Sequence, residues 1–396
     1  MNSIERKFQL LMSLGFRKSL YVWLYRLFNL FEGAYKRYKK VYAEKRWHTK
    51  MYNFKKNHKD IFEKKLTKNE QKGIKKFYEK YGLRVSDDWH LFYSRVNGFF
   101  SDKYIPETLF YQEIEPVLNK YNRLKVYGEK NLYQKIYPLE FQPNTLLRCM
   151  NNHFFTEKYE IVPAAHLETF LAGRDGLYVI KPSIDSFGGR NIYLAEIKNS
   201  KILIDNSAED IHSITERYSG NFIIQYYVHQ HEKIHLLNPS SLNTVRIITL
   251  RLYENIHMLS SFLRLGNNDS IVDNMTSGGM GIGIDIDGKF TEFGIDIMLN
   301  RVENFPPSIG KKELTHYPFF DIIKETVTEL HTHTPDFNLV SWDMVINNRN
   351  QPIMIENNLS MQDSLIHQAL NGPLFGDLTD DVLAEVVRRK KKGSRS

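Results

Sequence analysis

The sequence predicts an α+β protein in which helices come first and a mostly antiparallel sheet follows. Apolar side chains recur at helical spacing through about residue 81, as at Tyr21, Leu24, Tyr25 and Phe28. From residue 177 the chain changes to short β-rich runs separated by turns. The length of 396 residues suggests two or three domains, and the 42% hydrophobic and 25% charged residues are ordinary for a globular protein.

Charge is distributed unevenly along the chain. Residues 1–80 contain 22 Lys or Arg and 7 Asp or Glu, and the last nine residues contain six basic groups and no acid. The net charge of +8 therefore describes two basic ends, which flank a mildly acidic body. The single Cys149 excludes an internal disulfide and a Cys-rich zinc site, and it fits a reducing compartment.

The basic N-terminal stretch is best interpreted as amphipathic helix. Arg17, Lys18 and Arg26 interrupt its apolar residues, so no run reaches the ~20 that a membrane span needs, and no signal-peptide pattern follows. The favoured interpretation is a helix packed on its own domain, and contact with an anionic membrane surface is the alternative. Nucleic acid is not expected, because the aromatic residues cluster on the apolar side. We expect a cytoplasmic protein, with peripheral contact at the inner face of the membrane left open.

The individual elements follow from local patterns. Asp87 and Asp88 form a helix-capping cluster with Ser86, and a turn at Asp287-Gly288 predicts a hairpin. We expect helices over residues 107–119 and 317–330. We expect strands over residues 177–180, 192–197, 222–228, 245–252, 257–265, 281–286, 340–346 and 352–356.

Three motifs resemble known sites without meeting their requirements. The glycine-rich stretch before Lys289 copies most of a P-loop, but Phe290 stands where Ser or Thr would bind magnesium. The stretch from Asp285 is too short for an EF-hand loop. The histidine pairs at 229/231 and 331/333 lack a third ligand nearby, so solvated or hydrogen-bonded histidines are favoured over zinc.

The most informative stretch is residues 340–358, where two apolar runs flank a polar turn. If Arg349 and Asn350 form a two-residue turn, then Met344 lies opposite Ile355 and Ile346 lies opposite Ile353. The same register puts Asp343 directly opposite Glu356 on the other face, and Asn358 follows on that side.

Two facing carboxylates repel each other unless a positive charge lies between them. A divalent cation such as Mg²⁺ would satisfy Asp343 and Glu356, because it prefers carboxylate and carbonyl oxygens and keeps positions open for phosphate. The alternative is a longer turn and a shifted register, in which one of the two acids is only a solvated strand residue.

Other segments suit phosphate and nucleotide binding. The Gly188-Gly189 pair lets backbone N–H groups approach an anion closely, and Lys181 can supply a point charge to a phosphate. Arg246 and Arg264 lie on predicted strands, where arginine suits the charge of a transferring phosphoryl group. Surface ion pairing is the alternative for each arginine.

The order of these elements resembles the ATP-grasp superfamily. It is similar to the glutamate ligases of ribosomal proteins and to D-alanine–D-alanine ligases. Residues 242–249, 262–266, 272–279 and 341–358 resemble most closely the sugar-transfer-associated ATP-grasp family, which is often linked to bacterial polysaccharide synthesis. Where many relatives have Pro-Gly soon after the final Asn, this chain has Leu359-Ser360-Met361-Gln362, so the acceptor does not follow from the relatives.

The resemblance implies an ATP-grasp fold, in which two α+β lobes clasp ATP behind a basic helical N-terminal region. It implies a basic helical region over residues 1–85, a pre-ATP-grasp region over 86–176, a nucleotide lobe over 177–235, a metal and acceptor lobe over 236–387, and a basic tail over 388–396.

The resemblance also implies roles for single residues. Lys181 and Lys130 would contact the nucleotide, and Glu232 would hold the ribose. Two Mg²⁺ (or Mn²⁺) ions would bind in the second lobe, and Glu356 would bridge them. The remaining ATP contacts would be Ser186, Gly188 and Gly189 in the loop and Gln225, Tyr226 and Val228 at the adenine. The metal ligands would be Asp343, Glu356 and Asn358. The catalytic residues would be Arg246, which would contact the acceptor, and Arg264 and Asn274, which would contact the γ-phosphate and the acyl phosphate.

The implied reaction is an ATP-dependent ligation. ATP would phosphorylate a carboxylate to an acyl phosphate, and an amine or another nucleophile would displace the phosphate. The partners would then be a small-molecule or glycan-linked carboxylate acceptor and an amine donor. Two alternatives remain open here, a kinase of a sugar or glycan hydroxyl and a non-catalytic ATP-binding scaffold at a membrane assembly.

Overall fold

The computed structural model describes residues 45, 47, 49–184, 191–267, 273, 275, 278–303 and 314–393. The predicted amphipathic helix in residues 1–44, and the site residues Ser186, Gly188, Gly189 and Asn274, lie outside these residues. The chain divides into two compact units, Met1–Asp60 and Ile61–Ser396. In the described part of the chain, no helix is long and apolar enough to cross a membrane.

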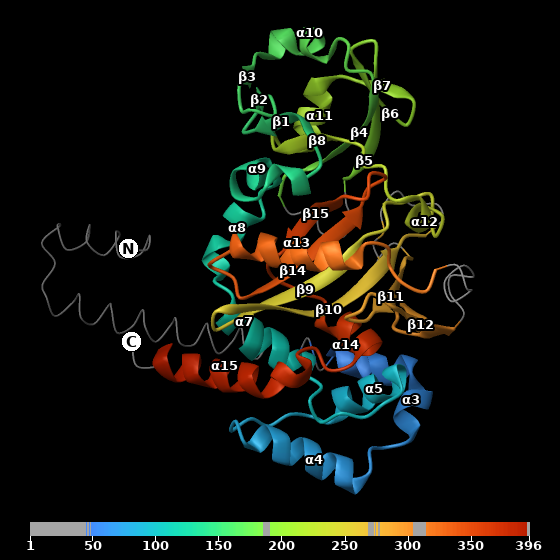
Figure 1. The fold of residues 1–396 in the computed structure, drawn as a ribbon, viewed down its shortest axis with the longest axis vertical. Helices are drawn as coiled ribbons and strands as arrows, with labels where there is room; N and C mark the ends of the chain where they lie inside the picture. Colours follow the sequence, from blue (N-terminus) through green and yellow to red (C-terminus); the bar gives the residue numbers. More distant parts are fainter. Residues whose placement is uncertain are drawn as a thin grey trace, which may run out of the picture. The chain divides into compact units, whose positions relative to one another are not determined.

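The second unit confirms the predicted α+β class, with two sheets whose strand pairs are all antiparallel (Figure 1). The first sheet has the strand order β3-β2-β1-β8-β4-β5-β6-β7. Its hydrophobic core contains Ile180 and Ile224 together with Ile214 of the helix α11 (Ile211–Arg217). Its strands are β1 (Thr145–Met150), β2 (His153–Phe155), β3 (Ile161–Val162), β4 (Gly176–Pro182), β5 (Tyr193–Lys198), β6 (Lys201–Ile204), β7 (Ser207–Glu209) and β8 (Phe222–Tyr226).

The second sheet has the strand order β13-β12-β11-β10-β9-β14-β15. Its strands are β9 (Val245–Leu252), β10 (Asn255–Leu265), β11 (Met280–Ile284), β12 (Phe290–Asp296), β13 (Arg301–Glu303), β14 (Leu339–Ile346) and β15 (Pro352–Asn358). Every residue of β14 is buried. This burial on both faces explains why the sequence of β14 is almost continuously apolar around Asp343.

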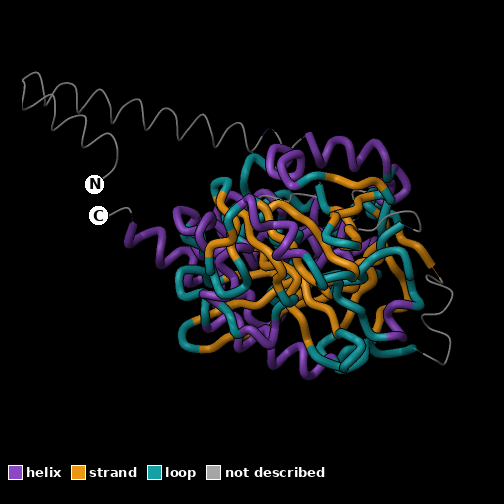
Figure 2. Tube along the Cα trace, turned by 90° about the horizontal axis from the view of Figure 1, so that it is seen from above, coloured by secondary structure: helices purple, strands orange, loops and turns teal. Residues whose placement is uncertain are grey.

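Helices cover both faces of the second sheet, and the strands lie inside them (Figure 2). Alternate residues of β9 enter different cores, because successive side chains of a strand point to opposite faces. Ile247 packs in the cluster that contains Val327 of α13 (Phe320–Thr332), whereas Ile248 packs in the cluster that contains Phe77 and Val382. The helices of the second cluster are α4 (Lys68–Glu79), α5 (Asp88–Asn97), α6 (Glu107–Leu109), α7 (Glu115–Leu118) and α15 (Thr379–Gly393).

The helix predicted over residues 107–119 is present but irregular. Between α6 and α7 the turn from Phe110 to Ile114 is a π-helix. Such single π turns inside helices are often found at functional sites. The buried Glu107 and Glu115 lie on either side of this turn.

The β14–β15 hairpin corrects one part of the predicted register. Ile346 pairs with Pro352 and Met344 with Met354, so the two-residue turn is wrong and the loop has one residue more. Asn350 closes this loop with φ 63°, a left-handed conformation that Asn tolerates and that three-residue hairpin loops use. A bulge between Asp343 and Met344 then shifts the register back, so Asp343 does lie opposite Glu356.

The hairpin predicted at Asp287-Gly288 joins β11 to β12. Its connection is longer than expected, because β11 ends at Ile284 and β12, which continues to Asp296, begins at Phe290. Gly288 has φ +84°, which explains why glycine occupies this position of the turn.

Candidate functional site

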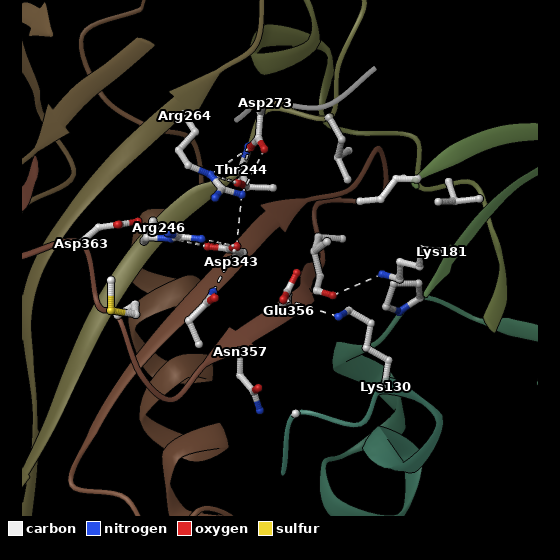
Figure 3. A pocket seen from close by; sticks show the side chains of 18 of the residues that line it. Lys130, Lys181, Thr244, Arg246, Arg264, Asp273, Asp343, Glu356, Asn357 and Asp363 are labelled. Carbon is white, nitrogen blue, oxygen red and sulfur yellow. Dashed lines mark hydrogen bonds and ion pairs between the residues drawn. The ribbon is translucent and has the colours of Figure 1, made fainter. Parts of the chain in front are cut away.

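A cavity of about 650 Å³ lies between the two sheets of the second unit (Figure 3). Val179, Leu194 and Gln225 line it from the first sheet, and side chains of β9, β10, β14 and β15 line it from the second. The charged residues that line it are Lys125, Lys130, Lys181, Arg246, Arg264, Asp273, Asp343, Glu356 and Asp363.

Two lysines lie at the side of the cavity that the first sheet provides. Lys181 is near the end of β4, and its Nζ donates to the carbonyl oxygen of Ile355 at 3.5 Å. Lys130 Nζ lies 3.5 Å from Glu356 Oε1. Burial and, to a smaller extent, the charge of Lys130 lower the pKa of Lys181 to about 8, although Glu356 acts in the opposite direction. Both lysine side chains are buried, so an incoming anion would stabilise their charged forms.

The predicted adenine-binding residues Gln225, Tyr226 and Val228 all line this cavity. Gln225 pairs across strands with Val179, and Tyr226 pairs with Tyr178. The structure places Glu232 at the first position of the short helix α12 (Glu232–His235), outside the described lining of the cavity. The ribose contact of Glu232 stays a prediction.

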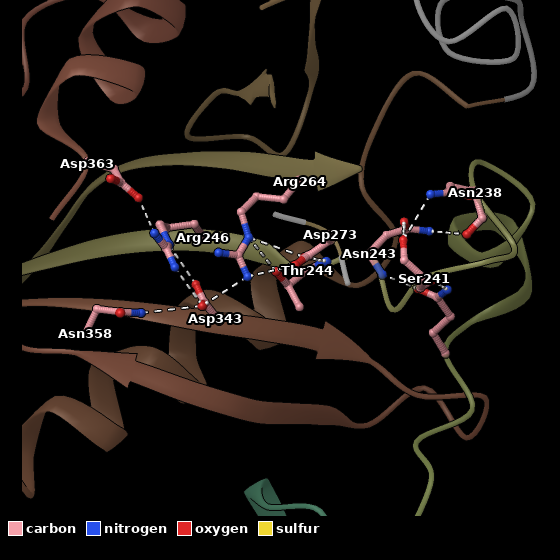
Figure 4. A network of polar contacts seen from close by, with 11 residues as sticks. Asn238, Ser241, Asn243, Thr244, Arg246, Arg264, Asp273, Asp343, Asn358 and Asp363 are labelled. Atoms are coloured by element: carbon pink, nitrogen blue, oxygen red, sulfur yellow. Dashed lines mark hydrogen bonds and ion pairs between the residues drawn. The ribbon is translucent and has the colours of Figure 1, made fainter. Parts of the chain in front are cut away.

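Asp343 lies between two arginines from neighbouring strands (Figure 4). Arg246 is its cross-strand partner on β9 and donates to it twice, from Nε to Oδ1 and from Nη2 to Oδ2, each at 2.8 Å. Arg264 on β10 approaches Oδ2 with its Nη2 at 3.1 Å. Burial acts to raise the pKa of Asp343, but the two guanidinium groups lower it below its ordinary value. Asp343 is thus held ionised.

Asp273 and Thr244 hold Arg264 in place. Arg264 Nη2 lies 3.0 Å from Asp273 Oδ1, and its Nε donates to Thr244 Oγ1 at 3.0 Å. The backbone N–H of Thr244 also donates to Asp273, at 2.8 Å. Burial raises the pKa of Asp273 above its ordinary value, although Arg264 opposes this shift. The carboxylates and arginines therefore alternate in one row through the site.

The oxygen donors at the hairpin suit magnesium. Asp343 and Glu356 occupy paired positions on β14 and β15, and Asn358 Nδ2 lies 3.4 Å from Asp343 Oδ2. Two carboxylates and an amide are hard ligands of the kind that Mg²⁺ prefers. Among the described residues no group of three His, Cys, Asp or Glu side chains could hold a metal, and the third candidate ligand here is an amide, that of Asn358.

The structure also revises why the two carboxylates tolerate each other. The sequence suggested that a positive charge, with a divalent cation as the favoured source, offsets their repulsion. Instead, Arg246 and Arg264 neutralise Asp343, and Lys130 faces Glu356. Positively charged side chains therefore lie beside both carboxylates of the hairpin.

Sequence reasoning grouped Asp273 with the two arginines but gave it no role, and it gave none to Thr244 or Asp363. Asp363 pairs with Arg246 through Nη1, and it begins α14 (Ser364–Asn371). Two of them lie close in sequence to predicted site residues, because Thr244 is two positions before Arg246 and Asp273 directly precedes Asn274. The sequence around Arg246 holds no nearby acid, and its partners Asp343 and Asp363 lie 97 and 117 positions away, so local sequence carried no signal for these pairs.

Comparison with protein families matches residues 109–381 to a family described as sugar-transfer associated ATP-grasp. Comparison with curated proteins found no match. Similar solved structures include the L-amino acid ligase from Bacillus licheniformis, with 13% identity, 68% of this chain and 48% of that chain covered, and a TM-score of 0.33. The D-alanine–D-alanine ligase from Bacillus anthracis has 13% identity, covers 68% of this chain and 69% of that chain, and has a TM-score of 0.35.

This chain spans about half the length of the Bacillus licheniformis enzyme. The family match, in contrast, extends over most of the chain, from before the π-helical turn to α15. It includes both sheets and every described residue of the alternating row of charges. The chain therefore belongs to the sugar-transfer-associated ATP-grasp family.

Proposed function

We propose that the protein is an ATP-dependent carboxylate–amine ligase that works through an acyl phosphate, in the synthesis or modification of a bacterial cell-surface polysaccharide. The observation that supports this most directly is the row Arg246–Asp343–Arg264 beside Glu356 and Lys130. This row places two guanidinium groups beside a predicted metal site, where charge develops when a phosphoryl group is transferred.

In the proposed reaction, an oxygen of the substrate carboxylate attacks the γ-phosphorus of ATP, and the bond to the β-phosphate oxygen breaks to release ADP. A protonated amine then loses one proton to solvent, and its nitrogen attacks the acyl carbon. The carbon–oxygen bond to phosphate breaks, and the second amine proton leaves with the phosphate. The products are an amide, ADP and inorganic phosphate.

The chain's own residues would act at separate points of this sequence. Lys181 and Lys130 would bind the nucleotide phosphates as buried cations. Arg264, fixed by Asp273, would stabilise the charge on the transferred group. Asp343, Glu356 and Asn358 would hold Mg²⁺, which when bound supplies charge neutralisation at the phosphates.

Product analysis tests this proposal. The full-length protein would be incubated with Mg-ATP, a panel of carboxylates and hydroxylamine, which captures an acyl phosphate as a hydroxamate. We expect ADP and hydroxamate to form together for the accepted carboxylates. Release of AMP, or a stable phosphorylated product without hydroxamate, would contradict the ligase; the second result would favour a kinase.

We also propose a peripheral position at the inner face of the membrane, mediated by the basic N-terminal residues. Their net charge of +15 over residues 1–80 supports this, since each basic residue near an anionic surface contributes about 1 kcal/mol. Full-length protein should sediment with anionic vesicles at low salt, and deletion of residues 1–35 should abolish this while ATP binding remains. Failure of the full-length protein to sediment would contradict the proposal.

A further inference from the structure

A short helical segment that precedes β1 contacts both sheets. This connecting segment, residues 127–137, carries the cavity residue Lys130. On the side of the first sheet, Asn131 Nδ2 donates to the carbonyl oxygen of Cys149 at 3.0 Å. On the side of the second sheet, the hydroxyl of Tyr133 donates to Asn357 of β15 at 3.1 Å. The helical elements of the segment are η3 (Lys130–Leu132) and α9 (Tyr133–Ile136).

Asn357 lies between two predicted metal ligands of β15, Glu356 and Asn358. Because successive side chains of a strand point to opposite faces, Asn357 is directed away from Glu356 (Figure 3). Asn357 is 5% exposed, and its cross-strand partner Trp342 belongs to the hydrophobic core that also contains Tyr133. A buried amide in such surroundings costs free energy unless its polar atoms have partners.

The connecting segment supplies those partners. The amide oxygen of Asn357 accepts from the hydroxyl of Tyr133 at 3.1 Å. The amide nitrogen donates to the carbonyl oxygen of Tyr127 at 3.1 Å and to the hydroxyl oxygen of Tyr137 at 2.5 Å. Since a carbonyl only accepts, Tyr127 fixes which end of the amide is the nitrogen. The Tyr133 oxygen also accepts from the backbone N–H of Asn357 at 3.4 Å, so side chain and backbone are held together.

A bulge makes this end of β15 depend on contacts outside the hairpin. Between the pairs Asp343–Glu356 and Met344–Met354, β15 has one residue more than β14. The residues beyond a bulge are therefore not held in register by the hairpin loop alone. A slip of one residue would exchange the two faces of the strand, and Glu356 would turn from the cavity to the core. The amide of Asn357 has its partners on the core side, so it opposes that slip.

We propose that Tyr133 and Asn357 are positioning residues of the predicted metal site. They hold Glu356 and Asn358 on the cavity side of β15. They also fix these ligands relative to the segment that carries Lys130, whose Nζ lies 3.5 Å from Glu356. Hydrogen bonds behind a metal site orient its ligands and adjust its affinity. The inference rests on the proposed function, because it takes Glu356 and Asn358 as ligands, and it adds the residues that set their orientation.

Mn²⁺ binding tests the inference without relying on turnover. The full-length protein is titrated with Mn²⁺ in the presence of ADP, and the electron paramagnetic resonance signal of the free ion gives the Kd. Tyr133→Phe removes only the hydroxyl that Asn357 binds, and it should weaken Mn²⁺ binding by about 10–100-fold. Asn357→Leu has a side chain of similar size and should have the same effect. The double variant should bind Mn²⁺ no more weakly than Asn357→Leu alone, because the two residues act as one unit.

Two further variants serve as controls. Tyr78 is 1% exposed, and its hydroxyl donates to the carbonyl oxygen of Tyr104 at 2.6 Å, in the core on the other face of the second sheet. Tyr78→Phe therefore loses a buried hydrogen bond of the same kind. Urea unfolding should show a comparable loss of stability, whereas its Mn²⁺ affinity should not change. Glu356→Gln should abolish Mn²⁺ binding, which shows that the titration reports this site.

The outcomes separate this inference from the proposed function. Unchanged Mn²⁺ affinity in folded Tyr133→Phe and Asn357→Leu would overturn it. Additive losses in the double variant, or an equal loss in Tyr78→Phe, would overturn it as well. If the unaltered protein with ADP binds no Mn²⁺, the predicted metal site fails and this inference fails with it. If the variants behave as expected but no carboxylate gives a hydroxamate, the proposed ligase fails while this inference stands.

Discussion

At the scale of single residues, Lys181 connects burial with ligand affinity. Its pKa of about 8 means that it is about half protonated at pH 8 in the empty site. An ATP phosphate would favour the charged form, so binding should take up about half a proton at pH 8, and affinity should fall as pH rises through this range. Calorimetry in two buffers with different ionisation enthalpies measures the uptake.

Lys181→Met should remove this proton uptake and weaken ATP binding by about 1.5–3 kcal/mol, the value of a hydrogen bond to a charged group. Lys201→Met is the matched control, because Lys201 is an exposed residue of β6. Unchanged affinity in Lys181→Met would remove this lysine from the nucleotide site.

The two hairpin carboxylates should differ in their effect on stability. Asp343→Asn leaves the buried Arg246 and Arg264 with fewer anionic partners, and breaking a buried pair costs about 3–5 kcal/mol. Glu356 is 28% exposed and makes one contact at 3.5 Å, with the buried Lys130, so Glu356→Gln should lose less stability than Asp343→Asn. Urea unfolding compares the two, and magnesium-dependent turnover should be lost in both. A larger loss of stability in Glu356→Gln would contradict this account.

At the scale of elements, His331 joins α13 to the second sheet. Its Nδ1 lies 2.7 Å from Thr249 Oγ1 on β9, and its Nε2 lies 3.1 Å from the carbonyl oxygen of Phe337. Burial lowers its pKa to about 3, so the folded protein keeps this histidine neutral while the unfolded chain protonates it below pH 6.5. Its contribution to stability is thus complete above pH 6.5 and is lost as pH falls towards 3.

His331→Asn should lower the free energy of unfolding at pH 7 by about 1–3 kcal/mol, because buried hydrogen-bonding groups lose their partners. This deficit should shrink by up to about 1.4 kcal/mol per pH unit below pH 6.5, since the variant lacks the titrating group. Urea unfolding at several pH values measures both effects. His212→Asn, at an exposed position, should show neither. A deficit that stays constant with pH would contradict the assignment.

At the scale of the whole second unit, the cavity lies between two sheets with separate hydrophobic cores. A nucleotide that contacts both should stabilise them together. At a concentration 100 times its Kd, Mg-ATP should add about 2.7 kcal/mol to the free energy of unfolding. Hydrogen exchange should slow in β4 and β8 and, at the same ligand concentration, in β14 and β15. Protection of one sheet alone, or protection that persists in EDTA, would contradict a magnesium-dependent site between them.

The sequence by itself determined the α+β class and most of the strands, whereas the predicted pairing of Asp343 with Glu356 holds because a bulge offsets a loop that is one residue longer than expected. The class and the strands follow from alternation of apolar and polar residues over a few positions, which depends only on neighbours in the chain. The length of the β14–β15 loop was not determined in this way. The extra residue of this loop is accommodated by the left-handed Asn350, and the bulge after Asp343 offsets its effect on the register. The pattern of apolar residues in the sequence is the same for either loop length.

Only the tertiary structure decided what neutralises the carboxylates and what lies at the far end of the cavity. Arg246 meets Asp343 because β9 pairs with β14, although the two residues are 97 positions apart in sequence. Asp363 reaches the same arginine from the start of α14. Strand order and helix placement are set by the burial of whole faces, such as that of α13 on the second sheet. Local periodicity indicates which face of a strand is polar, but it does not specify which distant charge that face will meet.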